Sequence, residues 1–334
     1  MSRSVIVTVN ALHLLSSEME KRDEVLLVTG QHLDPVIFQE GVAINNIKVP
    51  GGLLEKKVIE TCLQSVSFIP SVIIAIGGGR IMDAAKLMIH FSGWQNFRFI
   101  AIPTTAGSGS EATPFAVMYE DREKTSIENF RLLPQLVYLD PSFLQQLPSL
   151  QRAVSGIDAF CQSVESLWNK KADPVSKTYA AASIRLLWKE LPQFVKVNES
   201  DIGKRMLWAS YLSGLAISST RTTGCHALSY YLTAKHGIPH GQAVAFFVPL
   251  FFYYNKEANL DEICQLLQAP NEVEAAAKVI TFMKSCGLAT RFSEMGIKVN
   301  VDELLDSVNA ERFSNNPVSF NREILKDLIT QHLI

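Results

Sequence analysis

The sequence predicts an α/β protein in which a doubly wound parallel sheet is followed by an all-helical domain. The chain has 334 residues, about twice the ~150 residues of a typical domain. Short apolar runs alternate with helical patterns up to residue 140, and no convincing strand pattern follows Asp140-Pro141. We therefore expect an α/β domain over residues 1–145 and a helical domain over residues 146–334.

Five apolar runs in the first domain are expected to be strands. They are continuously apolar rather than alternating, which is typical of parallel strands that helices cover on both faces. The runs lie at residues 6–9, 25–29, 72–76, 99–102 and 136–139. Helical patterns at residues 53–65 and 82–91 separate some of these strands and indicate a doubly wound sheet.

Helical periodicity dominates the second domain. Apolar residues recur at steps of three and four over residues 154–168, which predicts one buried helix face. Asp173 and Pro174 have the pattern of an N-cap followed by the first residue of a helix. Further helices are expected at residues 204–217, 271–286 and 322–332.

Charge and cysteine content limit the possible partners and compartment. With 31 basic and 33 acidic side chains, the chain has no global basic field that would hold nucleic acid or an anionic membrane. Its five cysteines are scattered without a CxxC pair, which argues against a disulfide framework. The N-terminus does not resemble a signal peptide, and no apolar run reaches roughly 18 residues. We therefore expect a cytoplasmic protein.

Two glycine-rich turns follow predicted strands. Gly77, Gly78 and Gly79 come directly after the strand at residues 72–76 and precede a helix. A second turn, at residues 103–111, carries hydroxyls and glycines; its hydroxyls include Thr104, Thr105, Ser108 and Ser110. Glycine lets a phosphate approach the backbone, and a helix N-terminus offers free N–H groups. One such turn is also compatible with simple chain reversal, but two at strand ends favour a nucleotide site. Because GxGxxG and GxxxxGK[ST] are absent, the common dinucleotide and ATPase loops are disfavoured.

Polar residues of the helical domain form a candidate metal site. Asp158 and Gln162 are four residues apart and share a helix face. His226 and His240 are 14 residues apart, and the Gly-Ile-Pro break before His240 would turn the chain back towards Asp158. One Asp and two His are a plausible ligand set for a catalytic divalent metal. The structural alternatives are that Asp158 forms a local cap or salt bridge and that His236 and His240 are surface turn residues, which is the better interpretation for His236.

The motifs GGGRIMDAAK, PTTAGSGSE, GIDAFCQSVESLW and HALSYYLTAKHGIPHG span residues 72–241 in this order. Together they resemble the iron-containing (group III) alcohol dehydrogenase family. The resemblance implies NAD(P)-dependent interconversion of an alcohol and a carbonyl compound, assisted by Fe(II) or Zn(II). We expect a small aldehyde or alcohol as substrate and a homodimer as the assembly.

The resemblance also implies roles for individual residues. Gly77, Gly78 and Gly79 would hold the cofactor pyrophosphate, Asp83 would lie near the nicotinamide, and Lys124 would contact the nicotinamide ribose. The side chains that would line the cofactor are Thr104, Thr105, Ser108 and Ser110. The metal ligands would be Asp158, His226 and His240.

Three positions depart from the family pattern. Gln162 stands where a histidine ligand is usual, so it would be a weaker ligand, or three residues and water would hold the metal. Tyr230 replaces a frequent histidine and is a candidate proton relay, as is His236, although Tyr230 packing in the substrate pocket explains it equally well. Arg80 replaces a serine after the glycines and would add a cation at a phosphate, unless it is simply exposed to solvent.

Gly30 ends the second predicted strand, where family members that are strict for NAD tend to carry an acidic residue. An acid there accepts a hydrogen bond from the ribose 2′-hydroxyl and repels a 2′-phosphate. Gly30 removes that repulsion, so we expect the enzyme to accept NADP(H).

The departures themselves resemble the phosphonoacetaldehyde reductase branch of the family, through Asp-x-x-x-Gln and the Arg221-Thr222-Thr223 segment before HALSY. That branch reduces phosphonoacetaldehyde to 2-hydroxyethylphosphonate. Arg221 lies five residues before His226, and its forked guanidinium matches a phosphonate, although an ordinary salt bridge would also explain it. Lys235 is a second cation in this region.

Three alternatives remain open at this point. The first is a general short-chain alcohol or polyol dehydrogenase of the same family. The second is a lyase or cyclase resembling dehydroquinate synthase, which also pairs a dinucleotide with a metal. The third is a non-catalytic binding protein, suggested by the altered ligand at Gln162.

Overall fold

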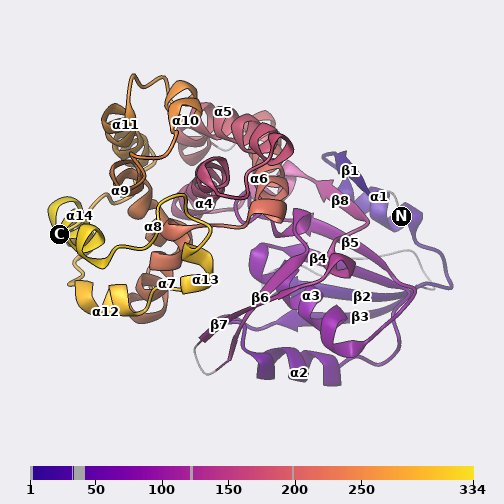
Figure 1. Ribbon diagram of the computed structural model, residues 1–334. Coiled ribbons are helices and arrows are strands. Elements are labelled where there is room, and N and C mark those ends of the chain that lie inside the picture. Colours follow the sequence, from indigo (N-terminus) through magenta and orange to yellow (C-terminus); the bar gives the residue numbers. More distant parts are fainter. Residues whose placement is uncertain (1–2, 32, 34–41, 121–122, 198) are drawn as a thin grey trace. The chain divides into compact units, whose positions relative to one another are not determined.

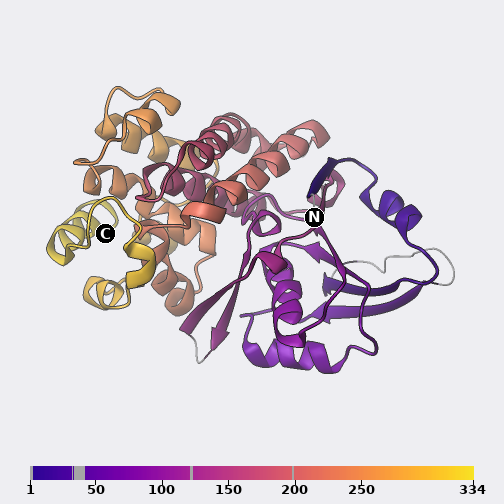
Figure 2. The ribbon, with the colours of Figure 1, turned by 45° about the vertical axis from the view of Figure 1, so that its right-hand side comes forward.

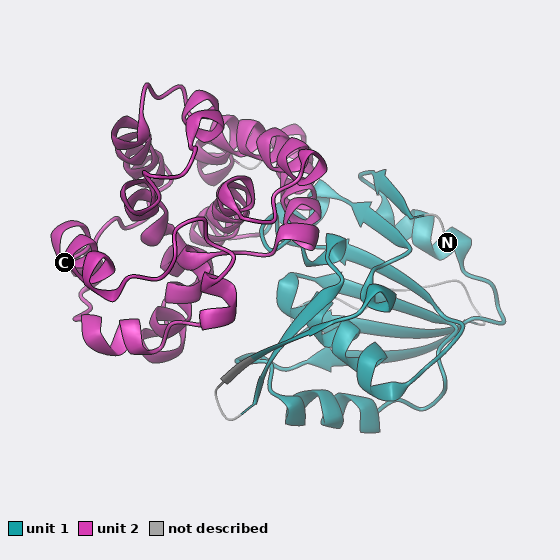
Figure 3. Cartoon of the chain, viewed as in Figure 1, with its two compact units in different colours: residues 1–146 teal, residues 147–334 magenta. Residues whose placement is uncertain are grey.

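The computed structural model describes residues 3–31, 33, 42–120, 123–197 and 199–334. The chain divides into two compact units, residues 1–146 and residues 147–334 (Figures 1 and 3). The division lies one residue beyond the expected end of the first domain. None of the helices in the described ranges combines the length and the apolar character that crossing a membrane requires.

Unit 1 contains a six-stranded, all-parallel sheet in the order β1-β8-β5-β4-β2-β3, which confirms the predicted fold class. Its strands are β1 (Ser4–Val7), β2 (Glu24–Gly30), β3 (Ala43–Val49), β4 (Val72–Gly77), β5 (Arg98–Pro103) and β8 (Leu136–Leu139). The first strand begins two residues earlier than expected. The edge strand β3 was not predicted, because polar residues interrupt its apolar pattern and only Ile47 and Val49 are buried.

Side chains alternate between the two faces of this sheet. On one face, residues such as Val25, Ile74 and Ile100 form a core with Ala11 and Leu15 of α1 (Ala11–Glu18). The other face is covered by α2 (Lys56–Gln64) and α3 (Gly79–Ser92) (Figures 1 and 2). The antiparallel hairpin of β6 (Phe115–Glu120), which is mostly apolar, and β7 (Glu123–Glu128), which is mostly polar, follows and was also not predicted. Short 3-10 turns are η1 (Ser110–Ala112), η2 (Phe130–Leu132) and η3 (Pro141–Leu144).

Unit 2 contains helices only in its described residues, as predicted. Its central element is α4 (Ser149–Trp168), which is buried on all sides from residue 152 onward and packs against α5 (Pro174–Lys196) and α6 (Ser200–Thr220). Asp173 caps α5 through the backbone N–H of Ser176, as its position before Pro174 predicts. The remaining helices are α7 (Gly224–His236), α8 (His240–Ala245), α9 (Phe247–Tyr254), α10 (Asp261–Leu266), α11 (Glu272–Ser285), α12 (Val301–Asp306), α13 (Ala310–Phe313) and α14 (Arg322–His332), with the 3-10 turn η4 (Phe292–Met295).

Candidate active site

The buried helix α4 carries a polar stripe made of Asp158, Gln162 and Glu165. These residues are spaced four and three apart, so they lie on one face of the helix. All three are buried, with exposed fractions of 7%, 5% and 0%. A polar stripe inside a helix that is otherwise packed into the core requires partners from neighbouring elements.

Two histidines meet Asp158 from α7 and α8. The Nε2 atoms of His226 and His240 lie 3.5 and 3.9 Å from the same oxygen, Oδ1 of Asp158. One possible ligand atom from each of the three residues lies within 4.8 Å of the other two. In a tetrahedral zinc site, bonds of about 2.1 Å place ligand atoms about 3.4 Å apart. The structure therefore brings the three predicted ligands, hereafter the Asp158 triad, close to metal-binding spacing.

Glu165 holds His226 from behind. One of its carboxylate oxygens pairs with Nδ1 of His226. The other accepts from the backbone N–H groups of Thr223 and Cys225, at 3.0 and 2.9 Å, and from the Thr223 hydroxyl. A carboxylate held in this way directs Nε2 of His226 towards Asp158, as in the carboxylate–histidine–metal arrangement of known metal sites.

The residues of the Asp158 triad fit a divalent metal ion. Nε2 of His226 is buried and has no hydrogen-bond partner among the residues that the structure describes. Burial would lower the pKa of His226, but Glu165 and Asp158 outweigh it and raise the pKa to about 10. One carboxylate and two imidazoles are a donor set that suits iron or zinc. A bound cation would thus satisfy both the unused nitrogen and the surrounding negative charge.

The turn between α7 and α8 returns His240 to the triad, as predicted. Gly237 ends α7 in the left-handed conformation, with φ of 66°, and Pro239 precedes the start of α8 at His240. The next residue, Gly241, packs directly against α4, where an added Cβ would overlap the carbonyl oxygen of Val154. Glycine at this position therefore lets α8 approach α4 closely enough for His240 to reach Asp158.

Gln162 is engaged by a neighbour on α6. Its Oε1 accepts a hydrogen bond from the Ser213 hydroxyl at 2.9 Å, and its Nε2 donates to Oδ2 of Asp158 at 3.4 Å. In this orientation the amide nitrogen faces Asp158, and the hydrogen bond from Ser213 occupies one of the two lone pairs of the amide oxygen. Coordination by Gln162 stays a prediction.

Tyr230 and His236 lie in different surroundings. The Tyr230 ring stacks on His240, with centroids 6.2 Å apart and planes at 17°. The ring contact of His236 is with Tyr231, at 5.6 Å, and the Tyr231 hydroxyl donates to a glutamate of α12. The same glutamate, Glu303, forms an ion pair with Lys235. Of the two candidate proton carriers, the structure brings Tyr230 to the triad.

Arg221 ends α6 in an unusual backbone conformation, with φ of 62° and ψ of −175°. The Asn169 side chain holds it by donating to the carbonyls of Thr220 and Arg221 at 3.0 and 3.2 Å. The pKa of Arg221 is lowered, mainly by burial and to a smaller extent by the positive charge of Arg312, whereas the negative charge of Glu311 raises it. Asn169 follows Asp158 by 11 positions, about 16 Å along a helix. The arginine backbone thus lies towards the end of α4, farther from Asp158 than the sequence spacing suggests.

Unit 1 contains a pocket of about 700 Å³ at the carboxyl ends of its strands. Four predicted cofactor residues line it: Gly30, Gly77, Gly78 and Thr104. Gly78 is also the N-cap of α3, so that helix presents its free N–H groups next to the pocket. The position and the helix terminus suit the pyrophosphate of a dinucleotide.

The two glycine-rich turns pack against each other. A Cβ on Gly78 would lie 3.0 Å from Oγ1 of Thr105, and one on Gly79 would overlap Oγ of Ser108. These glycines are therefore needed for packing as well as for any approach of a phosphate.

Several other predicted cofactor residues have structural partners. The Ser110 hydroxyl donates to Asp83 at 2.7 Å, and Asp83 also accepts from the backbone of Val117. Arg80 donates from Nε to the carbonyl oxygen of Gly52 at 2.7 Å and is half-buried, so it is not the freely exposed side chain of the alternative interpretation. Lys124 belongs to β7, but its side chain lies outside the described part of the structure.

Family models match both units. The model described as iron-containing alcohol dehydrogenase matches residues 2–141, and that of the C-terminal part of the same family matches residues 152–333. The chain belongs to the iron-containing alcohol dehydrogenase family. It is an oxidoreductase that acts on alcohols or aldehydes, as predicted.

Individual relatives share less than a third of their aligned residues with this chain. Phosphonoacetaldehyde reductase of Streptomyces viridochromogenes is 29% identical over 299 residues, covering 77% of this chain and 75% of that protein. Long-chain-alcohol dehydrogenase 1 of Geobacillus thermodenitrificans is 28% identical over 311 residues, covering 82% and 78%. The structure of sulfoacetaldehyde reductase from Bifidobacterium kashiwanohense in complex with NAD+ superposes with a TM-score of 0.87 at 22% identity, covering 99% and 96%. That structural likeness establishes the fold.

The sequence reasoning missed Glu165 as part of the site. Its signal was available, because Glu165 continues the stripe of Asp158 and Gln162 at the next helical step. A carboxylate on the same face as a candidate metal ligand suggests a residue that orients another ligand.

Proposed function

We propose that the chain is a metal-dependent, NAD(P)H-linked reductase of a small anionic aldehyde, with phosphonoacetaldehyde as the specific candidate and 2-hydroxyethylphosphonate as its product. The buried Asp158 triad, with one nitrogen of His226 left for a ligand, carries the proposal. Two relatives, one found by sequence and one by structure, are named for aldehydes with a phosphonate or a sulfonate group.

A bound divalent cation would polarise the aldehyde oxygen, and a reduced nicotinamide would supply the hydride that reaches the carbonyl carbon. The chain itself contributes geometry. Glu165 pairs with Nδ1 of His226, so that with a metal bound the proton would stay on Nδ1 and Nε2 would offer its lone pair to the metal. Tyr230, whose ring stacks on His240, is the candidate to give the product oxygen its proton.

Arg221 is the candidate partner of the substrate's anionic group. Its backbone conformation costs of order 1–3 kcal/mol outside glycine and persists because Asn169 holds both adjoining carbonyls. Such strain is common at binding sites, and a guanidinium matches the oxygens of a phosphonate. A second candidate function is that of a general short-chain alcohol dehydrogenase, which needs no contact between Arg221 and an anionic group. The position of the Arg221 backbone favours this candidate, because it lies at the end of α4 that is far from Asp158.

The test compares phosphonoacetaldehyde, acetaldehyde and glycerol as substrates, with NADPH and NADH, in the presence of Fe(II), Zn(II) or a chelator. We expect kcat/KM for phosphonoacetaldehyde to exceed that for acetaldehyde at least about tenfold, and Arg221→Met to lower only the former. We expect Asp158→Ala to abolish metal-dependent turnover. Equal values for both aldehydes would establish the general dehydrogenase instead, and normal rates in chelated buffer would refute the metal assignment. Consumption of NADPH with an aldehyde would exclude a lyase or cyclase, whereas tight dinucleotide binding without turnover would indicate a binding protein.

A further inference from the structure

Lys48 on the edge strand β3 reaches over the end of β2. In the sheet register Lys48 lies opposite Thr29, and Val49 lies opposite Gly30. The Lys48 ammonium lies 3.4 Å from the carbonyl oxygen of Gln31 and 3.3 Å from that of Leu33. The ammonium therefore sits at the segment that directly follows Gly30.

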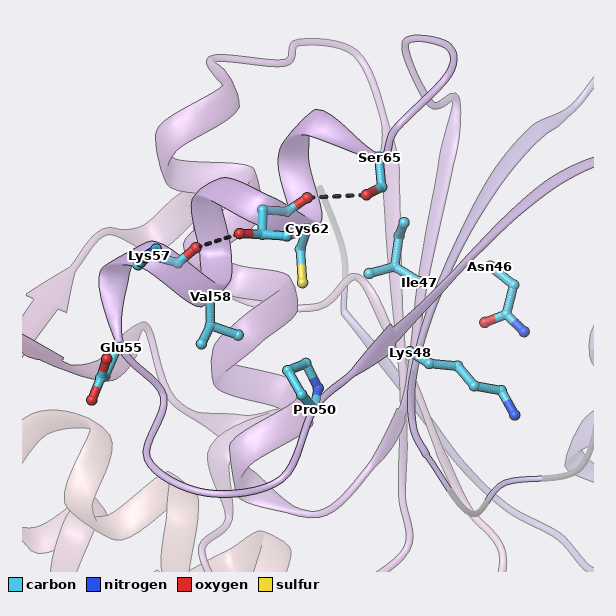
Figure 4. A pocket seen from close by; sticks show the side chains of 10 residues that line it. Asn46, Ile47, Lys48, Pro50, Glu55, Lys57, Val58, Cys62 and Ser65 are labelled. Carbon is cyan, nitrogen blue, oxygen red and sulfur yellow. Dashed lines mark hydrogen bonds between the residues drawn. The ribbon is translucent and has the colours of Figure 1, made fainter.

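The strand separates two groups of side chains at this point. Figure 4 shows Lys48 and Asn46 on one side of β3, with Ile47 on the other. Ile47 faces the interior and is buried, whereas Lys48 is exposed. Lys57 on α2 is a second exposed lysine, and it lines the same hollow of about 420 Å³ as Lys48. Unlike Lys48, its side chain makes no hydrogen bond to the segment after Gly30 among the described residues.

The segment that Lys48 contacts belongs to the cofactor pocket. Gly30, Gln31 and Leu33 line the same 700 Å³ pocket as the glycine turn at Gly77 and Gly78. In the sheet, β3 lies two strands from β4, a separation of about 10 Å. A ribose attached to a pyrophosphate at the glycine turn would be within reach of the Lys48 ammonium.

Among the described residues, no acidic side chain pairs with Lys48. Its hydrogen-bond partners are carbonyl oxygens, and no ion pair of Lys48 is recorded within the described ranges. Asp140 is the one carboxylate among the described residues that line this pocket, and it caps the backbone N–H groups of Ala11 and Ser142. Asp140 follows β8, three strand spacings or about 14 Å from β2. Lys48 therefore places a positive charge at the end of β2, beside the segment that follows Gly30.

We propose that Lys48 is a specificity-determining residue that binds the 2′-phosphate of NADP(H). An ammonium on a flexible stem is a suitable point charge for a phosphate, and it can exchange two carbonyl partners for a phosphate oxygen. A carboxylate at this place would select the 2′-hydroxyl of NAD(H) instead. The inference rests on the proposed function only in requiring a dinucleotide in this pocket, and it needs no particular aldehyde.

Calorimetric titration of the full chain with 2′,5′-ADP and with 5′-ADP tests this role without any turnover. We expect the chain to bind 2′,5′-ADP at least about tenfold more tightly than 5′-ADP. Lys48→Met should lower the affinity for 2′,5′-ADP about tenfold and leave that for 5′-ADP within about twofold. The matched control Lys57→Met should change neither affinity.

Steady-state kinetics give a second measurement. We expect Lys48→Met to lower the ratio of kcat/KM for NADPH to that for NADH about tenfold, and Lys48→Glu to lower it further through repulsion. The proposal is overturned if the unmodified chain binds the two ADP isomers equally. It is also overturned if Lys48→Met weakens both isomers alike, or if Lys57→Met has the same effect. Selective binding that depends on Lys48 would stand even if no aldehyde in the panel were reduced, so this inference and the proposed function fail separately.

Discussion

Each unit of the molecule buries a cluster of charged side chains, and the two clusters differ in how completely the nitrogen atoms at their centre are hydrogen-bonded. In unit 1, the Lys86 ammonium is fully buried and contacts five oxygens of Ser110, Thr113 and Phe115. In unit 2, His226 is equally enclosed, but only Nδ1 has a hydrogen-bond partner among the described residues. The Lys86 ammonium thus has no donor left for a ligand, whereas His226 has a nitrogen left for one.

This difference separates a structural role from a functional one. The Lys86 cluster, which also contains Asp83 and Glu111, joins α3 to the segment after the second glycine-rich turn and so holds the two turns together. In the Asp158 triad, the strongest hydrogen bonds lie behind His226 and direct its remaining nitrogen inward. Unused capacity alone does not identify a ligand site, because one oxygen of the buried Glu111 also has no hydrogen-bond partner among the described residues. The Asp158 triad differs in that the unused nitrogen of His226 faces two further possible ligands, Asp158 and His240.

The largest effect on stability is expected from Lys86→Met. Removing one partner of a buried, hydrogen-bonded charge cluster typically costs about 3–5 kcal/mol, because the acceptors and the carboxylate of Asp83 lose their countercharge. We expect a loss of this size in urea unfolding, followed through amide exchange in β4 and β5, with metal content unchanged. Exposed Lys57→Met is the control. A loss below about 1 kcal/mol would mean that the cluster contributes little to unit 1.

The sequence predicted the backbone features of both sites better than their side-chain orientations. The turns at Gly77 and at Thr104 could be located because glycines and hydroxyls follow apolar strands, and the return of His240 because Gly237 and Pro239 break α7. The edge strand β3 was missed, since one of its faces is exposed and polar.

The orientation of single side chains required the structure. Arg80 turns to Gly52, and the oxygen of Gln162 turns to Ser213, although both were predicted to contact a ligand. Such choices depend on which neighbour supplies a hydrogen bond after packing, and no spacing along the chain encodes this.

A somewhat smaller effect is expected from Glu111→Gln, and it depends on pH. Burial raises the pKa of Glu111 to about 7, although the positive charge of Lys86 acts in the opposite direction. Burial also lowers the pKa of Lys86, to about 8. Between pH 4.5 and 7 the folded chain keeps a proton on Glu111 that the unfolded chain loses, so the free energy of unfolding falls as the pH rises.

The variant lacks this titration. The unfolding free energy of the unmodified chain, relative to that of Glu111→Gln, should therefore fall by up to about 3 kcal/mol between pH 4.5 and 7. Parallel urea titrations of both proteins across this range measure the difference. A constant difference would show that Glu111 is ionised throughout, and the Lys86 cluster would then be an ordinary ion pair.

The smallest of the three effects is expected from Glu165→Gln, and it acts on metal binding. The amide keeps the shape of the carboxylate but loses the negative charge that makes His226 a better ligand, so metal affinity should fall about 10- to 100-fold. Competition with a chromophoric chelator measures this affinity. Glu303→Gln is the matched control, because Glu303 pairs with Lys235 of the same helix α7 but does not contact His226 in the described structure. Unchanged affinity in Glu165→Gln would remove the distinction between the two clusters, since the carboxylate behind His226 would then serve packing alone.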